Sequence, residues 1–390
     1  MKILFLTAHY PGFGGIEKVT HYIADAFSRA GHEVSILAGR NLIPADKREA
    51  DPTRGHIATH YLPDEADMLA PANAAFLNDF LFGRTHDVVI YQDSYVPDLF
   101  SLIDPTRLAA RTFRFIVVEH NMPRCHMLTW REFAASHSLA NPRNWLRLAL
   151  YPLLRARTAP REAARHRALV GAADRYIVLA EAYIGELLGI VGEEHAAKVS
   201  AIPNPTTIDI PSTLPEKKKQ CLFVARLERN KGVDILVSIW KKFHALHPDW
   251  ELLIVGTGRY TGYLQYLIHS GRLPSARLEG VHHDMRPYYA SASMLLLTSR
   301  IEGWVLVLAE AMAYGTTPVA FNSYGALTET MTDGREGAVI PAFRIDRYVQ
   351  AMSHLATHTP TTMRQAAHLR AQSLHIERIM PMWEEVIRKE

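Results

Sequence analysis

Two glutamates in the stretch SRIEGWVLVLAEAMAYG, residues 299–315, could take part in chemistry. Glu302 and Glu310 lie on either side of an apolar run that closes on Gly315. The run indicates a turn from a strand into a helix that begins near Val305. A surface loop followed by a buried helix would show the same spacing, so the two glutamates alone do not establish a site.

The start of such a helix is suited to an anionic ligand. Unpaired backbone N–H groups and the helix dipole favour a bound diphosphate by roughly 0.3–2 kcal/mol. Two cations, Arg226 and Lys231, flank another turn, which follows the apolar run CLFVA. Each can make charge-assisted hydrogen bonds of about 1.5–3 kcal/mol, enough to stabilise a leaving nucleoside diphosphate. Solvated surface charges are the alternative interpretation.

The elements that would position these residues alternate between strands and helices. KILFLTA near the N-terminus predicts a buried strand, and apolar residues at helical spacing from Ile16 to Phe27 predict the helix that follows it. Further short apolar runs alternate with helical patterns up to about residue 200, as expected for a parallel sheet covered on both faces. The first half of the chain is therefore predicted to be an α/β domain.

A change of composition separates this half from the next. Residues 201–219 contain four prolines and a lysine run, which indicate a linker. A second alternating series follows, with a helix expected from about Val233 to His247. We predict two doubly wound α/β domains, 1–203 and 204–375, with ligands at the carboxyl ends of the strands in a cleft between them.

Composition and length exclude several classes of protein. A chain of 390 residues can bury two full cores, and a net charge of +3 is too small to indicate nucleic-acid binding. Cys125 and Cys221 form neither a disulfide framework nor a metal-ligand cluster, which favours a reducing compartment. No apolar run is long enough for a secretory signal or a membrane span. We therefore expect a cytoplasmic protein.

Five segments, taken in order, resemble the retaining glycosyltransferases of GT-B fold in the family that includes bacterial lipopolysaccharide and capsule sugar transferases, glycosyltransferase family 4. They are GFGGIEKV, VARLERNKGVDIL, LLIVGTG, SRIEGWVLVLAEAMAYGTTPVAF and TDGREGAVI. The resemblance covers nearly the whole chain. It implies two Rossmann-like domains that face each other across a cleft, and a final helix, 376–390, that returns to the first domain.

The resemblance also implies a role for each matching residue. The catalytic side chains would be Glu302, beside the transferred sugar, and His120, at the end of the strand FRFIVVEH. Glu310 would bind the ribose hydroxyls. The other donor-binding positions would be Arg226 and Lys231 for the diphosphate, Gly14 and Gly15 in a loop near phosphate or acceptor, Val281 at the base, and Val305 and Leu306 through their amides.

Some of these residues can also be interpreted as having only a structural role. A histidine at a strand end or a Gly-Gly turn is more often structural, and Asp93 at another strand end is assigned no role. The chain also departs from the usual family pattern EGFG at Trp304 and Val305. A valine disfavours the left-handed backbone that glycine would permit. No Asp-x-Asp pair follows a strand, so neither a metal ion nor any other cofactor is expected.

A basic segment extends from Arg124 to Arg167. It contains nine arginines and two acidic residues, Glu132 and Glu162. Its aromatic residues include Trp130, Phe133, Trp145 and Tyr151. Such a mixture suits an anionic membrane surface, where each basic residue contributes about 1 kcal/mol. A solvated helical face explains the pattern equally well. The membrane interpretation would make the acceptor lipid-linked.

We therefore predict a metal-independent hexosyltransferase, retaining by resemblance. It would move a hexose from a UDP-linked donor to a glycan or lipid-linked glycan in cell-surface polysaccharide or lipopolysaccharide synthesis. It would work in the cytoplasm at the inner face of the plasma membrane. A nucleotide-sugar epimerase of the same fold and a non-catalytic nucleotide-sugar-binding scaffold are the alternatives. The four charged residues Arg226, Lys231, Glu302 and Glu310 argue against the scaffold, which has no need for them.

Overall fold

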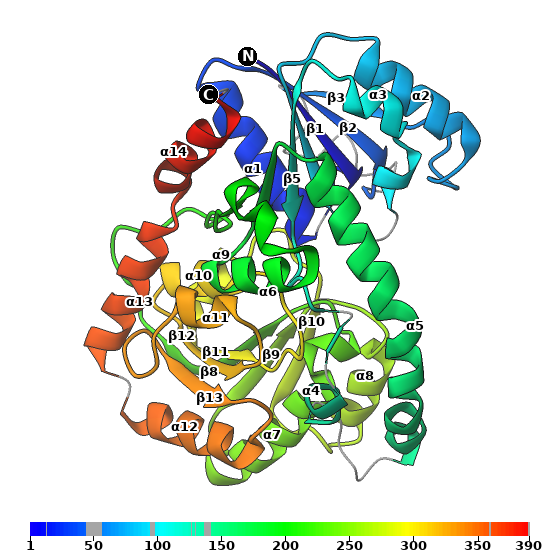
Figure 1. Ribbon diagram of the computed structural model, residues 1–390. Coiled ribbons are helices and arrows are strands. Elements are labelled where there is room, and N and C mark those ends of the chain that lie inside the picture. The colour runs from blue at the N-terminus through cyan, green and yellow to red at the C-terminus, as the bar shows by residue number, and fades with distance from the viewer. Residues whose placement is uncertain are drawn as a thin grey trace. The chain divides into compact units, whose positions relative to one another are not determined.

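The computed structural model describes residues 1–12, 14–43, 57–93, 98–125, 127–128, 130–135, 142–358 and 360–388. At 131, 132, 135 and 142–144 it describes the backbone alone. The chain forms two compact units (Figure 1). The first unit contains Met1–Met127, Arg155–Thr207 and Ile376–Glu390, and the second contains Leu128–Leu154 and Ile208–His375.

The first unit is built on a parallel sheet, which within the described residues has seven strands in the order β3-β2-β1-β4-β5-β6-β7. The strands are β1 (Lys2–His9), β2 (Glu33–Arg40), β3 (Ala58–Tyr61), β4 (Val88–Asp93), β5 (Arg114–Glu119), β6 (Arg175–Val178) and β7 (Val199–Ala201). The helices are α1 (Gly15–Arg29), α2 (Pro71–Phe82), α3 (Pro105–Ala109), α5 (Pro142–Ala172), α6 (Glu181–Val191) and α14 (Ile376–Ile387), with short 3-10 turns η2 (Leu99–Leu102) and η3 (Glu193–Lys198). The division between the units falls within α5, after Leu154.

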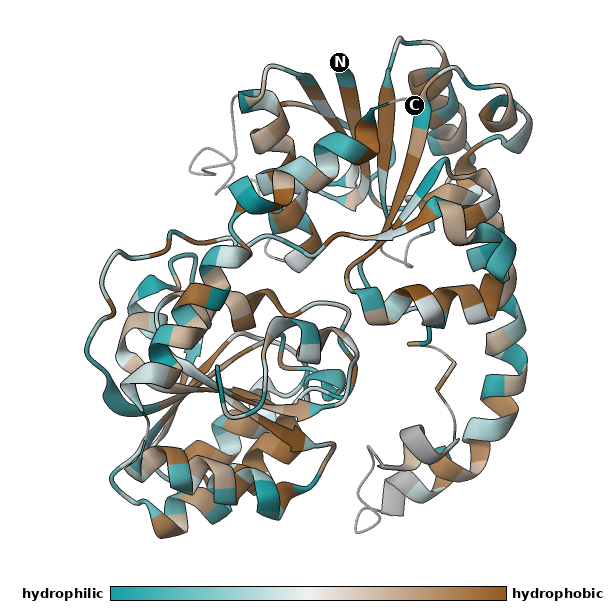
Figure 2. Ribbon diagram, turned by 60° about the vertical axis from the view of Figure 1, so that its left-hand side comes forward, coloured by the Kyte–Doolittle hydropathy of each residue, from teal (hydrophilic) through white to brown (hydrophobic). Residues whose placement is uncertain are grey.

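The central strands form the core of this unit because their side chains are apolar on both faces. Figure 2 shows these strands as mostly hydrophobic. Helix α1 packs Phe27 against Phe5 of β1 and Trp383 of α14. On α14 the side chain of Trp383 is buried, whereas 37% of Met382 is exposed. The indole ring of Trp383 therefore contributes to the contact between α14 and α1.

The second unit is also a parallel α/β unit, with a six-stranded sheet among its described residues in the order β10-β9-β8-β11-β12-β13. Its strands are β8 (Lys218–Val224), β9 (Glu251–Val255), β10 (Ala276–Gly280), β11 (Ala292–Leu297), β12 (Thr317–Asn322) and β13 (Ala338–Pro341). The helices are α4 (Trp130–Ala135), α7 (Val233–Leu246), α8 (Thr261–His269), α9 (Arg286–Ser291), α10 (Leu306–Ala313), α11 (Ala326–Thr330), α12 (Ile345–Thr357) and α13 (Thr361–Ser373), with the 3-10 turn η4 (Arg229–Lys231). The predicted α/β class holds for both units.

Helix α10 is short and almost wholly buried, and α13 holds its C-terminal end. The ring of His368 hydrogen-bonds through Nδ1 to the carbonyl of Ala313 at 2.6 Å, and Arg364 Nε donates to the carbonyl of Gly315 at 3.2 Å. Donors at a helix C-terminus satisfy carbonyls that have no partner within the helix. Within α10, Val307 is half-buried and Ala309 is fully buried.

No helix in the described part of the chain is both long and apolar enough to cross a membrane. Helix α5, with 31 residues, is the longest of the described helices, and Figure 2 shows hydrophobic and hydrophilic residues interspersed along it.

Candidate active site

The loop after β8 carries the two cations expected to bind phosphate. Arg226 is exposed, and Lys231 is half-buried in the turn η4. The turn ends on Gly232, whose φ of +71° lies in the left-handed region, and a Cβ there would meet the carbonyl oxygen of Thr298 at 1.9 Å. Glycine is therefore required at 232, because the backbone of one loop passes directly against the next.

Lys231 and Glu302 form an ion pair. The ammonium nitrogen lies 2.7 Å from each carboxylate oxygen. Their side chains are 19% and 10% exposed, so the pair is largely shielded from solvent. Glu302 belongs to the loop between β11 and α10, and β11 is the neighbour of β8 in the sheet. Two residues that lie far apart in sequence thus meet because their strands are adjacent and parallel.

The N-terminus of α10 follows directly after this pair. Val305 is the residue before the helix, with φ −102° and ψ 93°, and no side chain caps the helix start. This is extended backbone, which a valine adopts readily, so the departure from glycine causes no strain here. Val305 and Leu306 have buried side chains, and what they can offer to an anion is their backbone N–H groups.

The carboxylate of Glu310 accepts a hydrogen bond from a tyrosine. It is 2% exposed, and the hydroxyl of Tyr289 in α9 donates to its Oε2 at 2.6 Å. Burial, followed by the nearby Glu310 charge, raises the pKa of Tyr289 well above its ordinary value, so the phenol stays protonated as a donor. The carbonyl of Tyr289 in turn accepts from Lys217 Nζ at 2.6 Å.

Val281 lies at the end of another strand in the same unit. It follows Gly280, the last residue of β10, and its side chain is half exposed. The position fits a residue that acts through its main chain, since nothing in its side chain can hydrogen-bond.

Gly14 and Gly15 lie in the first unit, where α1 begins. Gly14 is the residue before the helix, with φ −80°, and Gly15 is the first residue within it. A Cβ on Gly14 would come within 2.1 Å of the carboxylate of Glu17. The Glu17 side chain is flexible and could move away, so glycine is required less strictly at position 14 than at position 232. Phe13, in the same predicted loop, lies outside the described residues.

His120 directly follows β5 and is 8% exposed. Its Nε2 hydrogen-bonds to the side-chain oxygen of Gln92 in β4. Burial lowers the pKa of His120 to about 4, against the opposing charge of Asp93. The ring is therefore neutral near pH 7, and a neutral ring that donates from Nε2 carries its lone pair on Nδ1.

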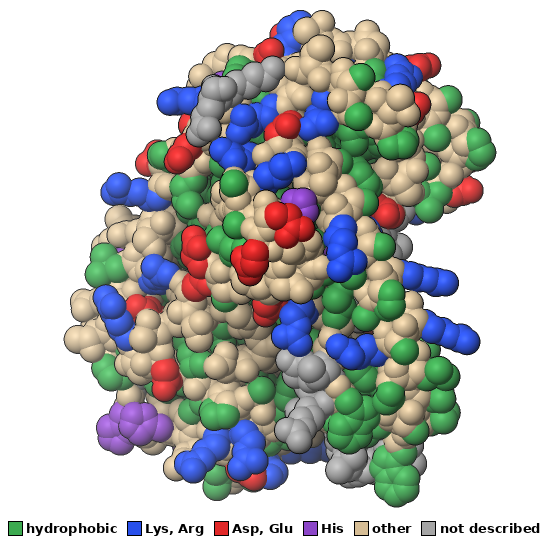
Figure 3. All heavy atoms as spheres, in the orientation of Figure 1, with side chains coloured by type: hydrophobic (Ala, Val, Ile, Leu, Met, Phe, Trp, Pro, Cys, Tyr) green, Lys and Arg blue, Asp and Glu red, His purple; other side chains and the backbone are tan. Residues whose placement is uncertain are grey.

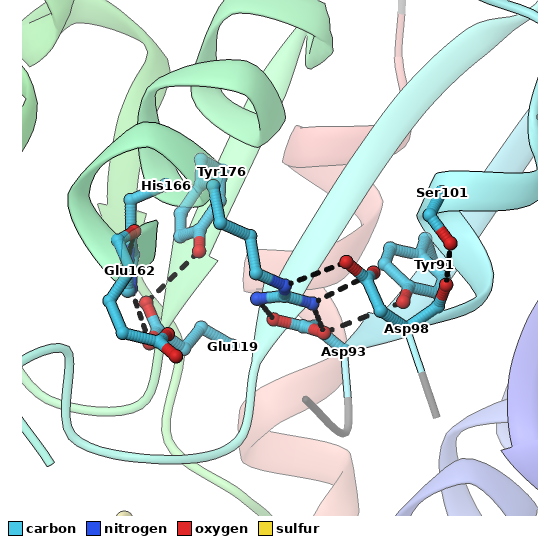
Figure 4. A network of polar contacts seen from close by, with 9 residues as sticks. Tyr91, Asp93, Asp98, Ser101, Glu119, Glu162, His166 and Tyr176 are labelled. Atoms are coloured by element: carbon cyan, nitrogen blue, oxygen red, sulfur yellow. Dashed lines mark hydrogen bonds and ion pairs between the residues drawn. The ribbon is translucent and has the colours of Figure 1, made fainter. Parts of the chain in front are cut away.

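A buried polar network adjoins His120 in the same unit (Figure 4). Asp93 is fully buried and accepts from Arg165 of α5, at 2.9 Å from Nη1 and 2.5 Å from Nη2. Arg165 also donates to Asp98 at 3.1 Å. Asp93, to which the sequence pattern assigns no role, thus joins β4 to α5.

The second half of this network is centred on Glu119, the residue before His120. Its two oxygens accept from His166 of α5 and from the hydroxyl of Tyr176 in β6, both at 3.0 Å. All three side chains are fully buried. Burial alone would lower the pKa of His166, but the charge and hydrogen bond of Glu119 outweigh it and raise that pKa.

Comparison with known protein families covers both units. Residues 13–209 match the family model described as Glycosyltransferase Family 4, and residues 218–358 match the model Glycosyl transferases group 1. The chain belongs to glycosyltransferase family 4. The family named by the five sequence segments is therefore confirmed.

A curated relative matches part of the chain. An uncharacterized glycosyltransferase of Haemophilus influenzae is 28% identical over 198 residues, 48% of this chain and 55% of that protein. The chain spans about half the length of this relative.

Solved structures establish the GT-B fold. The apo form of the lipopolysaccharide outer core galactosyltransferase WaaB is similar with a TM-score of 0.67 and 17% identity, over 99% of each chain. HepE of Anabaena, in complex with UDP and glucose, is similar with a TM-score of 0.72 and 16% identity, also over 99% of each chain. At these identities the likeness concerns the fold alone.

Within this family 4 chain, the structure brings some predicted residues together. Lys231 and Glu302 are in contact, and Glu310 lies in the helix that begins just after them. Gly14, Gly15 and His120 belong to the other unit and are described only within it. Sequence reasoning missed the partners: Tyr289, Gln92, Arg165 and His166 are ordinary residues of helices and strands until the fold places them.

The raised pKa of His166 predicts a dependence of stability on pH. In the folded protein His166 keeps its proton above the pH at which it would lose it in the unfolded chain. The stabilisation is fully present below pH of about 6.5 and is lost as pH rises through the higher folded pKa. The unchanged protein should therefore lose thermal stability as the pH rises above about 6.5, relative to the double variant Glu119→Gln, His166→Gln, as measured by calorimetric melting.

A surface histidine provides the control for this measurement. His354 is exposed, and His354→Gln should leave the pH dependence of melting as it is in the unchanged protein. If the melting temperatures of the unchanged protein and the double variant changed equally with pH across this range, the assignment of the proton to His166 would be contradicted.

Proposed function

We propose that the protein transfers a hexose from a UDP-sugar to a glycan or lipid-linked glycan, with retention of configuration, in lipopolysaccharide or cell-surface polysaccharide synthesis. The observation that carries the proposal is the contact of Lys231 with Glu302 immediately before the N-terminus of α10. The donor has a diphosphate directly next to its sugar. The cation and the helix start would meet the diphosphate, and the adjacent carboxylate would meet the sugar.

Each part of the donor has a suitable group in the second unit. Lys231 and the exposed Arg226 would bind the diphosphate, together with the amides of Val305 and Leu306. These charges would stabilise the UDP that leaves as the glycosidic bond breaks. Glu302 would then face the sugar, where a carboxylate can stabilise the positive charge that develops at the anomeric carbon.

The ribose and the base would be bound by the remaining predicted residues. One oxygen of Glu310 accepts from Tyr289, which orients the carboxylate, and Glu310 would accept hydrogen bonds from the ribose hydroxyls. Val281 would contact the base through its main chain. In the first unit, Gly14, Gly15 and the neutral His120 would serve the acceptor side or the transferred sugar.

The names of similar proteins support the substrate class. WaaB is a lipopolysaccharide outer core galactosyltransferase, and HepE is described with UDP and glucose. A UDP-hexose donor and a glycan of the cell surface are consistent with both. Two alternatives remain for the test: an epimerase would convert the sugar without an acceptor, and a scaffold would bind the donor without turnover.

The main test is Glu302→Gln. We expect UDP binding to be retained within about threefold, because the phosphates supply most of the affinity. Turnover should fall by about 100-fold or more, the size found when one stabilising group is removed from a transition state. Binding is measured by calorimetry with UDP, UDP-glucose and UDP-galactose. Turnover is measured as UDP release with octyl glycosides as acceptors.

Asp249→Asn is the matched control for this variant. Asp249 is an acid of the same unit that forms an exposed pair with Lys219, and its variant should bind and turn over normally. Turnover by Glu302→Gln close to that of the unchanged protein would remove Glu302 from the mechanism. Donor binding by the unchanged protein with no UDP release would favour the scaffold, and interconversion of the two UDP-sugars would favour the epimerase.

We further propose that transfer needs no metal ion. The support is that Arg226, Lys231 and the helix N-terminus offer positive groups to the diphosphate, as a bound cation would. Removal of metals with EDTA should therefore leave the rate of UDP release unchanged. Complete loss of turnover in EDTA, restored by added Mg²⁺ or Mn²⁺, would contradict this.

A specific surface supports a membrane-bound acceptor. On α5, Leu146, Leu150 and Leu153 are 65%, 43% and 57% exposed, and they lie on one side of the helix at spacings of three and four. No Asp or Glu occurs from residue 133 to 161, whereas Arg147 and Arg157 are exposed among these leucines. Figure 3 shows hydrophobic side chains with Lys and Arg side chains over this part of α5.

Two aromatic residues of the basic segment contact other parts of the protein. Phe133 and Tyr151 stack on each other with ring centroids 3.8 Å apart, and Tyr151 donates to the carbonyl of Leu128 at 2.7 Å. These two aromatic residues join α4 to α5 instead of pointing to a bilayer. The exposed leucines and arginines take their place, and we propose that they bind anionic lipid at the inner face of the plasma membrane.

Two variants of α5 test the proposal. Leu146→Ser, Leu150→Ser, Leu153→Ser removes the apolar contact, and Arg147→Gln, Arg157→Gln removes up to about 2 kcal/mol of attraction to the headgroups. Both should reduce sedimentation with vesicles of phosphatidylglycerol and phosphatidylcholine. Binding of the unchanged protein should weaken as salt rises, since screening shortens the reach of the charges.

The control for these variants is Leu369→Ser, an exposed leucine of α13 that should have no effect on sedimentation. Equal vesicle binding by all four proteins would contradict the membrane proposal. Loss of a dimer in light scattering on removal of the leucines, with vesicle binding unchanged, would instead make this face an interface between two copies.

A further inference from the structure

We propose that Arg300 is a positioning residue, which together with Asp234 keeps the loop of Lys231 and the loop of Glu302 in register when a donor separates that ion pair. The inference rests on the proposed function and extends it to two residues that contact neither the diphosphate nor the sugar in that proposal.

Arg300 is placed to act on both loops at once. It lies two residues before Glu302, and its side chain is only 5% exposed. Its guanidinium forms a two-pronged contact with Asp234, with Nη1 and Nη2 each donating to one carboxylate oxygen at 2.8 Å. Asp234 is in the first turn of α7, three residues after Lys231. The pair thus connects a residue two positions before Glu302 to a residue three positions after Lys231.

Further contacts of Arg300 fix the turn itself. Nη1 also donates to the carbonyl of Arg229 at 2.6 Å, and the backbone N–H of Arg300 donates to the carbonyl of Asn230 at 2.7 Å. Two of these acceptors are backbone carbonyls of the turn that carries Lys231. The path of this turn is therefore set by Arg300 and does not depend on where the Lys231 side chain points.

Thr298 adds a second connection between the same loops. Its hydroxyl lies 3.0 Å from the carbonyl of Lys231 and 3.1 Å from that of Gly232. Together with the close approach at Gly232, this leaves little freedom in the backbone. The contact of Arg300 with Asp234 differs from those of the Thr298 hydroxyl because it is charged and uses two nitrogens. It does not involve the Lys231 side chain, so it would remain when Lys231 turns away from Glu302.

A second connection between the two loops is needed because of the proposed chemistry. In the free protein, Lys231 and Glu302 hold each other, and a donor that takes Lys231 for its diphosphate must break that pair. Without another connection, the two loops could then move apart, and a displacement of about 1 Å can lower a rate by about 100-fold. The Arg300–Asp234 pair is a charged contact that does not involve Lys231 or Glu302 and would remain when that ion pair separates.

The favourable electrostatics of the pair agree with this role. Burial by itself would raise the pKa of Asp234, but the hydrogen bonds and charge of Arg300 outweigh burial and lower it. Asp234 therefore remains ionised throughout the range in which the enzyme would work. A lysine at 300 could keep the charge, but it has no planar fork to reach both carboxylate oxygens and the Arg229 carbonyl.

The test compares Arg300→Lys and Asp234→Asn with the unchanged protein. We expect UDP to bind more weakly, because Lys231 is displaced, and kcat to fall as well, because Glu302 is displaced. The combined loss in kcat/KM should be about 10- to 100-fold. The double variant should be no worse than the poorer single variant, since the two residues act as one unit. Arg277→Lys, in an exposed pair with Glu279 of the same unit, should have no effect.

A readout without ligand separates this inference from the proposed function. Hydrogen–deuterium exchange should rise in the peptides covering 229–232 and 298–302 in both variants, and stay unchanged elsewhere in the second unit. Unchanged exchange in these peptides, or additive losses in the double variant, would overturn the role of Arg300. If the unchanged protein binds no UDP but both variants still show faster exchange in these peptides, the positioning role of Arg300 stands and the proposed function is rejected.

If Arg300→Lys fails to fold, Asp234→Asn carries the test alone, since Asp234 is 37% exposed and its amide keeps the shape of the carboxylate. Normal UDP affinity and normal kcat in that variant would then overturn the inference.

Discussion

The site depends on one constraint of topology, the adjacency of β8 and β11 in a parallel sheet. The strand order of the second unit reverses between these two strands, so that the chain leaves them toward opposite faces. Ligands bind at such points in doubly wound sheets because the two loops diverge and leave room between them. The loop after β8 carries Lys231, and the loop after β11 carries Glu302. Their ion pair, the approach at Gly232 and the contacts of Arg300 all follow from this adjacency.

The strands and the loops that follow them could be predicted from the sequence, because a buried parallel strand is a continuous apolar run and its end is marked by polar residues. The contacts within the site could not. Tyr289 lies in a short helix with no unusual pattern, and its hydrogen bond to Glu310 exists only because α9 and α10 come together in the fold. Arg300 and Asp234 are charged residues of ordinary appearance, and local sequence contains no sign that the two will pair. The aromatic residues of the basic segment show the same limit, since the sequence pattern fitted a membrane surface and a solvated helical face equally well and did not indicate that Phe133 and Tyr151 stack on each other.

The first unit uses buried charge in a different way. Arg165 and His166 of one helix hold the ends of β4 and β5 through Asp93 and Glu119, directly beside Gln92 and His120. A buried ion pair recovers its desolvation penalty only with good geometry and further hydrogen bonds, and both acids here have at least two donors. Such a pair adds little to stability compared with apolar packing of the same volume. What it provides is a fixed direction for the strand ends.

Helix α5 contributes to both units, because the boundary between them falls within it, after Leu154. In the first unit, Arg165 and His166 connect its C-terminal part to the strand ends next to His120. In the second unit, its N-terminal part exposes Leu146, Leu150 and Leu153. The side chains of the two parts therefore act differently: buried charges orient strand ends in the first unit, and exposed apolar side chains form the surface proposed to bind lipid in the second.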